Sequence, residues 1–155
     1  MIGRTAGILR ALADHGQTLA VAESLTGGLL AGEIVSVPGA STVFRGGLVV
    51  YATDLKASLA GVPAELLAQR GPVDPDVAIW LAQGARQRCG ADWGLATTGV
   101  AGPDPQDGVP VGTVYLGLAR PDGSVLARRL DLTGDRAAIR TASVAGALDL
   151  LADQL

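Results

Sequence analysis

Short apolar runs alternate along the chain with segments whose apolar residues recur every three or four positions. The runs that suit buried strands are residues 18–22, 48–51 and 93–97. The segments with helical spacing are residues 2–15, 29–35, 63–69 and 75–89, together with one that starts near residue 53. This alternation predicts parallel strands that are joined by crossover helices.

The last third of the chain departs from this alternation, because two strand-like runs follow each other without a helix between them. Residues 111–119 and 125–132 are joined by residues 120–124, where proline and glycine favour a turn. We therefore predict an antiparallel hairpin, followed by a final helix over 135–152. The predicted fold is a single-domain α/β three-layer sandwich, whose mixed sheet has a parallel part and a C-terminal antiparallel hairpin.

Local signals mark several helix ends. Gly16 ends the first helix, and we expect His15 before it to bond to the last carbonyl groups rather than to carry chemistry. Thr53 is suited to cap the helix that follows residues 48–51. Asp74 is suited to cap the next long helix, with Pro75 in its first turn.

Composition limits the size of the unit and its possible partners. With 155 residues, 48% of them apolar, the chain can bury one core, and we expect one domain over residues 1–155 that stands alone. The net charge of −3 argues against a nucleic-acid surface. No apolar stretch reaches membrane-spanning length and no signal-peptide pattern opens the chain. We therefore expect a soluble cytoplasmic protein without a membrane partner.

Few side chains are available for chemistry. One histidine, His15, and one cysteine, Cys89, cannot form a zinc site of the usual ligand number within one chain. Asp104 and Asp107 lie close together but lack a calcium-loop pattern, so we expect no metal and no cofactor. Among the 12 basic residues only Lys56 is a lysine, which reflects either coding bias or a requirement for lysine.

The polar turn at residues 22–28, Ala-Glu-Ser-Leu-Thr-Gly-Gly, is the strongest candidate for a site. It places Ser24 at or next to a helix N-terminus, where free N–H groups and glycines allow an anion to approach the main chain. Simple capping by Ser24 is the competing explanation. Tyr51, at a strand end, and Lys56, about one turn into the next helix, can face the same cleft.

Further motifs in a fixed order resemble the C-terminal domain family of the competence-damage-inducible protein CinA. Together with residues 22–28, they are residues 37–41, residues 46–51 with Lys56, residues 98–103, residues 110–115 and residues 134–136. Characterised members of that family are nicotinamide mononucleotide deamidases, which hydrolyse the carboxamide to nicotinate mononucleotide and ammonia. The resemblance implies this activity in pyridine nucleotide salvage, with a small-molecule nucleotide as the partner and a serine and a lysine in catalysis.

The resemblance and the residue chemistry together define an expected site. Ser24 would attack the carbonyl carbon, and Lys56 would take the proton directly or through Tyr51. The alternative is direct attack by water, with Ser24 only positioning the amide. The N–H groups around Thr26 to Gly28 would hold the oxyanion. The expected substrate-binding residues are Thr26, Gly27, Gly28, Gly46, Gly47, Thr98, Gly99, Ala101, Gly102, Arg136 and Arg140.

Some alternatives stay open at this level. Arg136 and Arg140 oppose the dipole of the last helix, so they either pair with acids or collect an anion such as the substrate phosphate. The same residues would also serve a hydrolase of another carboxamide, or a catalytically silent module that binds a nucleotide or a partner. Trp80, Trp93 and an alanine-rich helix lead us to expect a homo-oligomer.

Overall fold

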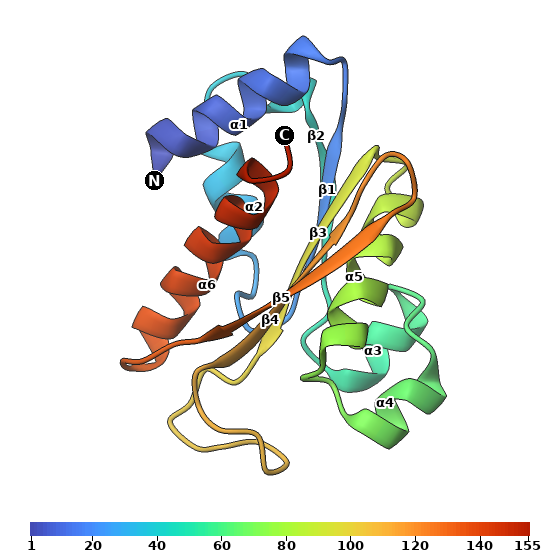
Figure 1. Ribbon diagram of the computed structural model, residues 1–155, viewed down its shortest axis with the longest axis vertical. Coiled ribbons are helices and arrows are strands. Elements are labelled where there is room, and N and C mark those ends of the chain that lie inside the picture. Colours follow the sequence, from blue (N-terminus) through green and yellow to red (C-terminus); the bar gives the residue numbers. More distant parts are fainter.

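Five strands form one mixed sheet in the order β2-β1-β3-β4-β5 in the computed structural model, which describes residues 1–155 (Figure 1). The strands are β1 Leu19–Glu23, β2 Phe44–Val49, β3 Trp93–Gly99, β4 Thr113–Ala119 and β5 Val125–Asp131. β1 pairs in parallel with β2 and β3, whereas β4 pairs antiparallel with β3 and β5. The predicted single-domain mixed sheet with a C-terminal hairpin is confirmed.

Helices cover both faces of this sheet and complete the three layers (Figure 1). One face carries α1 Ile2–Asp14, α2 Leu29–Val35 and α6 Arg136–Ala152; the other carries α3 Thr53–Ser58, α4 Ala64–Arg70 and α5 Pro75–Arg88. A short 3-10 helix, η1 Ala40–Thr42, follows α2. Alternation along β1 assigns Val21 to the core on the α6 side and Ala20 and Ala22 to the core on the α5 side.

The prediction for β2 was wrong in its boundaries and its burial. Gly46 and Gly47 lie inside the strand rather than at its start, and β2 alternates between half-buried and exposed residues. The reason is that β2 is an edge strand with β1 as its only neighbour. Gly47 is needed for packing, because an added Cβ atom would come within 2.8 Å of Val21 Cγ2.

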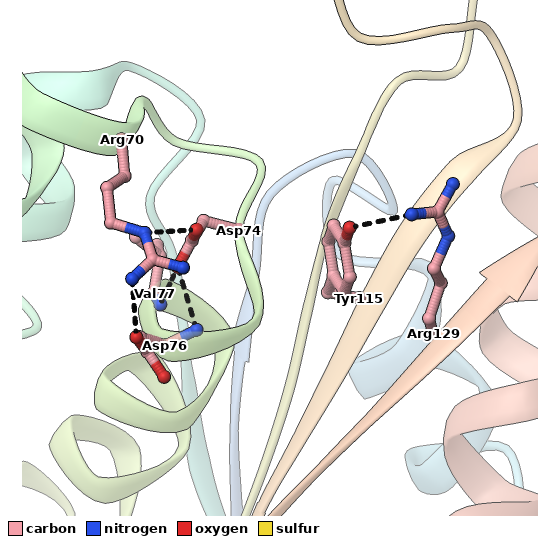
Figure 2. Close-up of polar contacts among 6 residues, drawn as sticks. All are labelled: Arg70, Asp74, Asp76, Val77, Tyr115 and Arg129. Carbon is pink, nitrogen blue, oxygen red and sulfur yellow. Dashed lines mark hydrogen bonds and ion pairs between the residues drawn. The ribbon is translucent and has the colours of Figure 1, made fainter.

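The N-terminus of α5 is capped as predicted, with Pro75 as its first residue. One carboxylate oxygen of Asp74 accepts hydrogen bonds from the backbone N–H groups of Asp76, at 2.8 Å, and Val77, at 3.3 Å (Figure 2). The other oxygen accepts a hydrogen bond from Nε of Arg70 at 2.8 Å. This buried carboxylate therefore joins the end of α4 to the start of α5.

Predictions at two other helix ends met different outcomes. His15 Nδ1 lies 2.8 Å from the carbonyl oxygen of Ala11, so the prediction that His15 meets the last carbonyl groups is confirmed. The prediction that Thr53 caps α3 was wrong, because Ala52 holds the cap position and no side chain bonds to that helix end.

Between β4 and β5, Arg129 Nη1 donates to the hydroxyl of Tyr115 at 3.2 Å (Figure 2).

The two tryptophans lie in different environments. Trp93 at the start of β3 is buried, and its indole N–H donates to the side-chain oxygen of Gln17 at 2.8 Å. Trp80 on α5 is 42% exposed, so the homo-oligomer expected partly from it stays a prediction. None of the helices combines the length and the apolar character that crossing a bilayer requires.

Candidate active site

Three segments meet where the parallel strands β2, β1 and β3 end. Ser24 directly follows β1, and Val50 and Tyr51 follow β2. The third segment, Thr98–Gly102, contains the last two residues of β3 and the start of the loop after it. Because β1 lies between β2 and β3, Ser24 lies between the other two segments. The carboxyl edge of parallel strands is the usual ligand-binding edge of an α/β sheet.

A pocket opens at this edge. Its lining comprises Ser24, Leu25, Tyr51, Thr53, Lys56, Pro72, Val73, Thr98, Gly99, Val100, Ala101, Gly102, Asp104, Gln106 and Arg136. The expected convergence of Ser24, the segment from Tyr51 to Lys56 and the Thr98 loop on one cleft is therefore confirmed. Within this pocket and elsewhere, no group of three or more His, Cys, Asp or Glu side chains is placed to hold a metal ion.

Ser24 and Lys56, which both line the pocket, are in direct contact. Lys56 Nζ lies 2.9 Å from Ser24 Oγ, and the lysine side chain is only 1% exposed. Nζ also donates to the backbone carbonyl oxygens of Val50, at 2.8 Å, and Tyr51, at 3.2 Å. α3 brings the amine back over the strand end that precedes it, so both carbonyl acceptors come from the β2–α3 connection.

The surroundings of Lys56 make its proton easier to lose than that of an exposed lysine. Burial lowers the pKa of Lys56 from 10.5 to about 8, and no carboxylate forms an ion pair with it. A neutral amine has two N–H groups and one lone pair. If the carbonyls of Val50 and Tyr51 accept the two N–H groups, the lone pair is left for the hydroxyl proton of Ser24. The arrangement therefore suits a general base beside a nucleophile.

Ser24 does not cap α2. The helix begins at Leu29 after a turn, and its cap residue Gly28 has a positive φ of 103° and no capping side chain. The carboxylate of Glu23 instead reaches across the turn and accepts hydrogen bonds from the first N–H groups of the helix. This role of Glu23 was not predicted, although an acidic residue that ends an otherwise apolar strand is an unusual sequence feature.

This finding changes which N–H groups are available to an oxyanion. The N–H of Gly27 donates to the carbonyl oxygen of Ser24 at 3.0 Å, and the N–H of Gly28 donates to Glu23 at 3.2 Å. The expectation that the N–H groups around Thr26 to Gly28 hold the oxyanion is therefore wrong for Gly27 and Gly28. The N–H of Thr26 forms no hydrogen bond within the protein, but Thr26 is fully buried and outside the pocket lining. The N–H of Leu25, a residue that lines the pocket, forms no hydrogen bond within the protein.

Thr26 lies behind the pocket rather than in its lining. Its side chain is fully buried, and its hydroxyl bonds to Glu23 at 2.6 Å and to Thr97 at 2.8 Å. Gly46 and Gly47, in the middle of β2, also lie outside the lining. The structure thus places these expected substrate-binding residues away from the pocket.

The hydroxyl of Tyr51 is not in the path between serine and lysine. The side chain is 60% exposed, and its hydroxyl accepts a hydrogen bond from Arg136 Nη2 at 3.1 Å. Only the main-chain carbonyl of Tyr51 contacts Lys56. The proton relay through Tyr51 is therefore not formed, whereas the direct contact between Ser24 and Lys56 is.

The two arginines of α6 have different environments, and neither pairs with an acid. Arg136 lines the pocket and donates to the carbonyl oxygen of Gly102 at 2.6 Å. Arg140 donates instead to the carbonyl oxygens of Leu25, at 2.9 Å, and Thr26, at 3.2 Å. Arg136 can meet a ligand, whereas Arg140 stabilises the turn that carries Ser24.

The pocket lining contains the expected residues at the end of β3 and in the loop after it, together with residues that were not expected. Thr98, Gly99, Ala101 and Gly102 all line the pocket as expected. The hydroxyl of Thr98 donates to the carbonyl oxygen of Pro72 at 2.7 Å, so this side chain holds the α4–α5 connection against the site. Pro72, Val73, Asp104 and Gln106 complete the lining. No local pattern marks these four, because only folding brings them together.

Comparison with known proteins gives consistent matches over nearly the whole chain. The CinA C-terminal domain family matches residues 4–155. A CinA-like protein from Frankia casuarinae is 57% identical over 144 residues, which are 93% of this chain and 33% of that protein. A CinA-like protein from Geobacter sulfurreducens is 50% identical over 150 residues, which are 96% of this chain and 36% of that protein. The chain thus spans about a third of the length of these relatives.

Solved structures agree with these matches. The competence/damage inducible protein CihA from Agrobacterium tumefaciens superposes with a TM-score of 0.94 at 34% identity, over 98% of this chain and 93% of that chain. A CinA superfamily protein from Escherichia coli superposes with a TM-score of 0.96 at 29% identity, over 100% of this chain and 91% of that chain.

Proposed function

The chain belongs to the CinA C-terminal domain family, and from this premise we propose that it hydrolyses the carboxamide of nicotinamide mononucleotide to nicotinate mononucleotide and ammonia. One observation carries the proposal: a buried lysine of lowered pKa, without an acidic partner, lies 2.9 Å from a serine hydroxyl, and both residues line a pocket. A serine activated by a neutral lysine is a recognised means of attacking an acyl carbon.

In the first half of the reaction, Ser24 Oγ bonds to the carboxamide carbon while its proton moves to Lys56 Nζ. The carbonyl oxygen becomes an oxyanion, and the free N–H of Leu25, next to the nucleophile, is the main-chain donor best suited to it. The carbon–nitrogen bond then breaks as the lysine ammonium returns the proton to the leaving nitrogen. Ammonia departs and an ester on Ser24 remains.

In the second half, water replaces ammonia. Lys56 is neutral again and takes a proton from water, while the water oxygen bonds to the ester carbon. Collapse of this intermediate breaks the bond to Ser24 Oγ, which regains a proton from Lys56 Nζ. Nicotinate mononucleotide leaves, and Ser24 and Lys56 return to their starting states.

The pocket lining supports an orientation for the substrate. Ser24 and Lys56 are buried members of the lining, whereas Arg136 is exposed, so the carboxamide would lie at the buried pair. Arg136 is the only arginine in the lining, and it is not paired with an acid. We therefore place the phosphate at Arg136, whose guanidinium can bind phosphate through two parallel hydrogen bonds.

Ammonia release by the purified protein tests the proposed activity. We expect release from nicotinamide mononucleotide, much less from nicotinamide or NAD, and no loss of rate when a chelator is added. Release from a different carboxamide alone would identify a hydrolase with another substrate. No release from any carboxamide would support a silent binding module and overturn the proposal.

Lys56→Arg tests the chemical step. Arginine keeps a positive charge but stays protonated, so we expect kcat to fall by about a hundredfold or more. Arg128→Lys is the matched control, because Arg128 pairs with Asp153 on the surface, where either cation serves. Thermal unfolding of both variants checks the fold. A folded Lys56→Arg protein with parental kcat would remove lysine from the mechanism.

A further inference from the structure

Glu23 is a buried charge that the proposed mechanism does not use. Its side chain is fully buried, and no cationic side chain forms an ion pair with it. Its carboxylate accepts hydrogen bonds from Thr26 Oγ1 at 2.6 Å and from the N–H groups of Gly28 at 3.2 Å, Leu30 at 2.9 Å and Ala31 at 3.0 Å. A buried carboxylate is costly unless such donors compensate it, so its position needs an explanation.

Glu23 and Ser24 are consecutive residues at the end of β1, and their side chains serve opposite faces of the sheet. The carboxylate of Glu23 bonds to α2 on one face, whereas Ser24 meets Lys56 of α3 on the other. This divergence follows from the alternation of side chains along a strand. The serine hydroxyl thus lies on one face of the sheet, and the carboxylate of the preceding residue bonds to α2 on the other.

The contacts of Glu23 reach the second half of the turn from Ser24 to Gly28 and the start of α2. They begin at Thr26, continue at Gly28 and end in the first turn of α2. Thr26 also bonds to the side chain of Thr97, and the N–H of Ser24 donates to the carbonyl oxygen of Thr97 at 3.1 Å. The turn is therefore tied to both β3 and α2.

We propose that Glu23 is a positioning residue, which holds the turn from Ser24 to Gly28 so that Ser24 Oγ stays within reach of Lys56 Nζ. This inference rests on the proposed role of Ser24 as the nucleophile. Both carboxylate oxygens of Glu23 accept hydrogen bonds, whereas a glutamine would present a donor at one of these positions. Small displacements of a nucleophile cost large factors in rate, so kcat is the sensitive quantity.

Two variants test this role and one matched variant controls for stability. Glu23→Gln keeps the size of the side chain, and Thr26→Val removes only the hydroxyl that bonds to Glu23 and Thr97. Asp92→Asn is the control, because Asp92 accepts hydrogen bonds from the N–H and hydroxyl of Thr18 near the opposite end of β1. We expect all three variants to unfold at lower temperature than the parent.

Only the first two variants should lose activity. For Glu23→Gln and Thr26→Val we expect kcat to fall by about tenfold or more, with KM changed by less than about twofold, because the pocket lining is kept. Asp92→Asn should keep the parental kcat at a temperature where it is folded. Parental kcat in both folded test variants, or a raised KM with unchanged kcat, would overturn the inference.

A substrate-independent assay separates this inference from the proposed function. A fluorophosphonate forms an oxygen–phosphorus bond with an activated serine and releases fluoride, while Lys56 takes the serine proton. Mass spectrometry should find Ser24 labelled about tenfold more slowly in Glu23→Gln than in the parent, and equal rates would contradict the inference.

Parental labelling without ammonia release would refute only the substrate assignment. Absence of both would refute the nucleophile and with it the positioning role. If Glu23→Gln does not fold, Thr26→Val decides the outcome.

Discussion

Lys56 gives the folding stability of this protein a pH dependence that can be measured without any substrate. Burial lowers the pKa of Lys56 from 10.5 to about 8, so at neutral pH the folded protein holds a buried ammonium at a cost in stability. Lys56→Met keeps an unbranched side chain but cannot titrate. We expect the difference in unfolding free energy between the parent and this variant to change with pH.

The sign and size of this change follow from the pKa values. Between about pH 8 and 10.5, the unfolded chain holds the proton of Lys56 more tightly than the folded chain, so parental stability rises with pH. One pKa unit corresponds to about 1.4 kcal/mol, so the lowering corresponds to about 3 kcal/mol in total. About 2.5 kcal/mol of this falls between pH 7 and pH 10. Groups that titrate in both proteins cancel in the difference.

Urea unfolding at one-unit steps from pH 7 to pH 10 measures this difference, with the fluorescence of buried Trp93 as the signal. Arg128→Met is the control, because it removes a surface cation whose loss should give a difference independent of pH. The carbonyl groups of Val50 and Tyr51 lose their partner in Lys56→Met. That loss adds a constant term and leaves the slope unchanged.

A flat difference between the parent and Lys56→Met across this range would refute the reasoning, since it would mean that folding leaves the pKa of Lys56 unchanged. Activity provides an independent check. If Lys56 is the base, kcat/KM should rise with pH and level off above a pKa of about 8. Agreement between the two pKa values would assign the kinetic pKa to this lysine.

Three further predictions address other parts of the molecule. Arg136→Ala should raise KM for the mononucleotide more than it lowers kcat. Arg140→Ala removes hydrogen bonds to the turn that carries Ser24, so it should mainly lower kcat. Steady-state kinetics that show an unchanged KM in Arg136→Ala would refute this prediction. Asp74→Ala should lower the unfolding free energy by about 2 kcal/mol through loss of the α5 cap, and an unchanged urea midpoint would contradict that. We also expect a homo-oligomer, and light scattering that shows a monomer at assay concentration would exclude it.

The sequence alone determined most of the elements and singled out two side chains of the candidate site. Local periodicity identified the strands that alternate with helices, and the proline and glycine at residues 120–124 identified the hairpin. Capping by Asp74 was also predictable, because a cap depends on neighbours in the chain. Ser24 stood out because it lies in a polar, glycine-containing turn after a strand, and Lys56 because it is the only lysine, whereas the family resemblance implied a serine and a lysine in catalysis.

Tertiary structure decided everything that depends on contacts between distant segments. Gly46 and Gly47 lie within the edge strand β2, before its carboxyl end, and they are outside the pocket lining. Arg136 and Arg140 are one helical turn apart, yet only the packing of α6 gives one to the pocket and the other to the nucleophile turn. The partners of Glu23 are near it in the chain, yet they were not predicted, because the N–H groups that a carboxylate can reach across a turn depend on the backbone conformation of that turn.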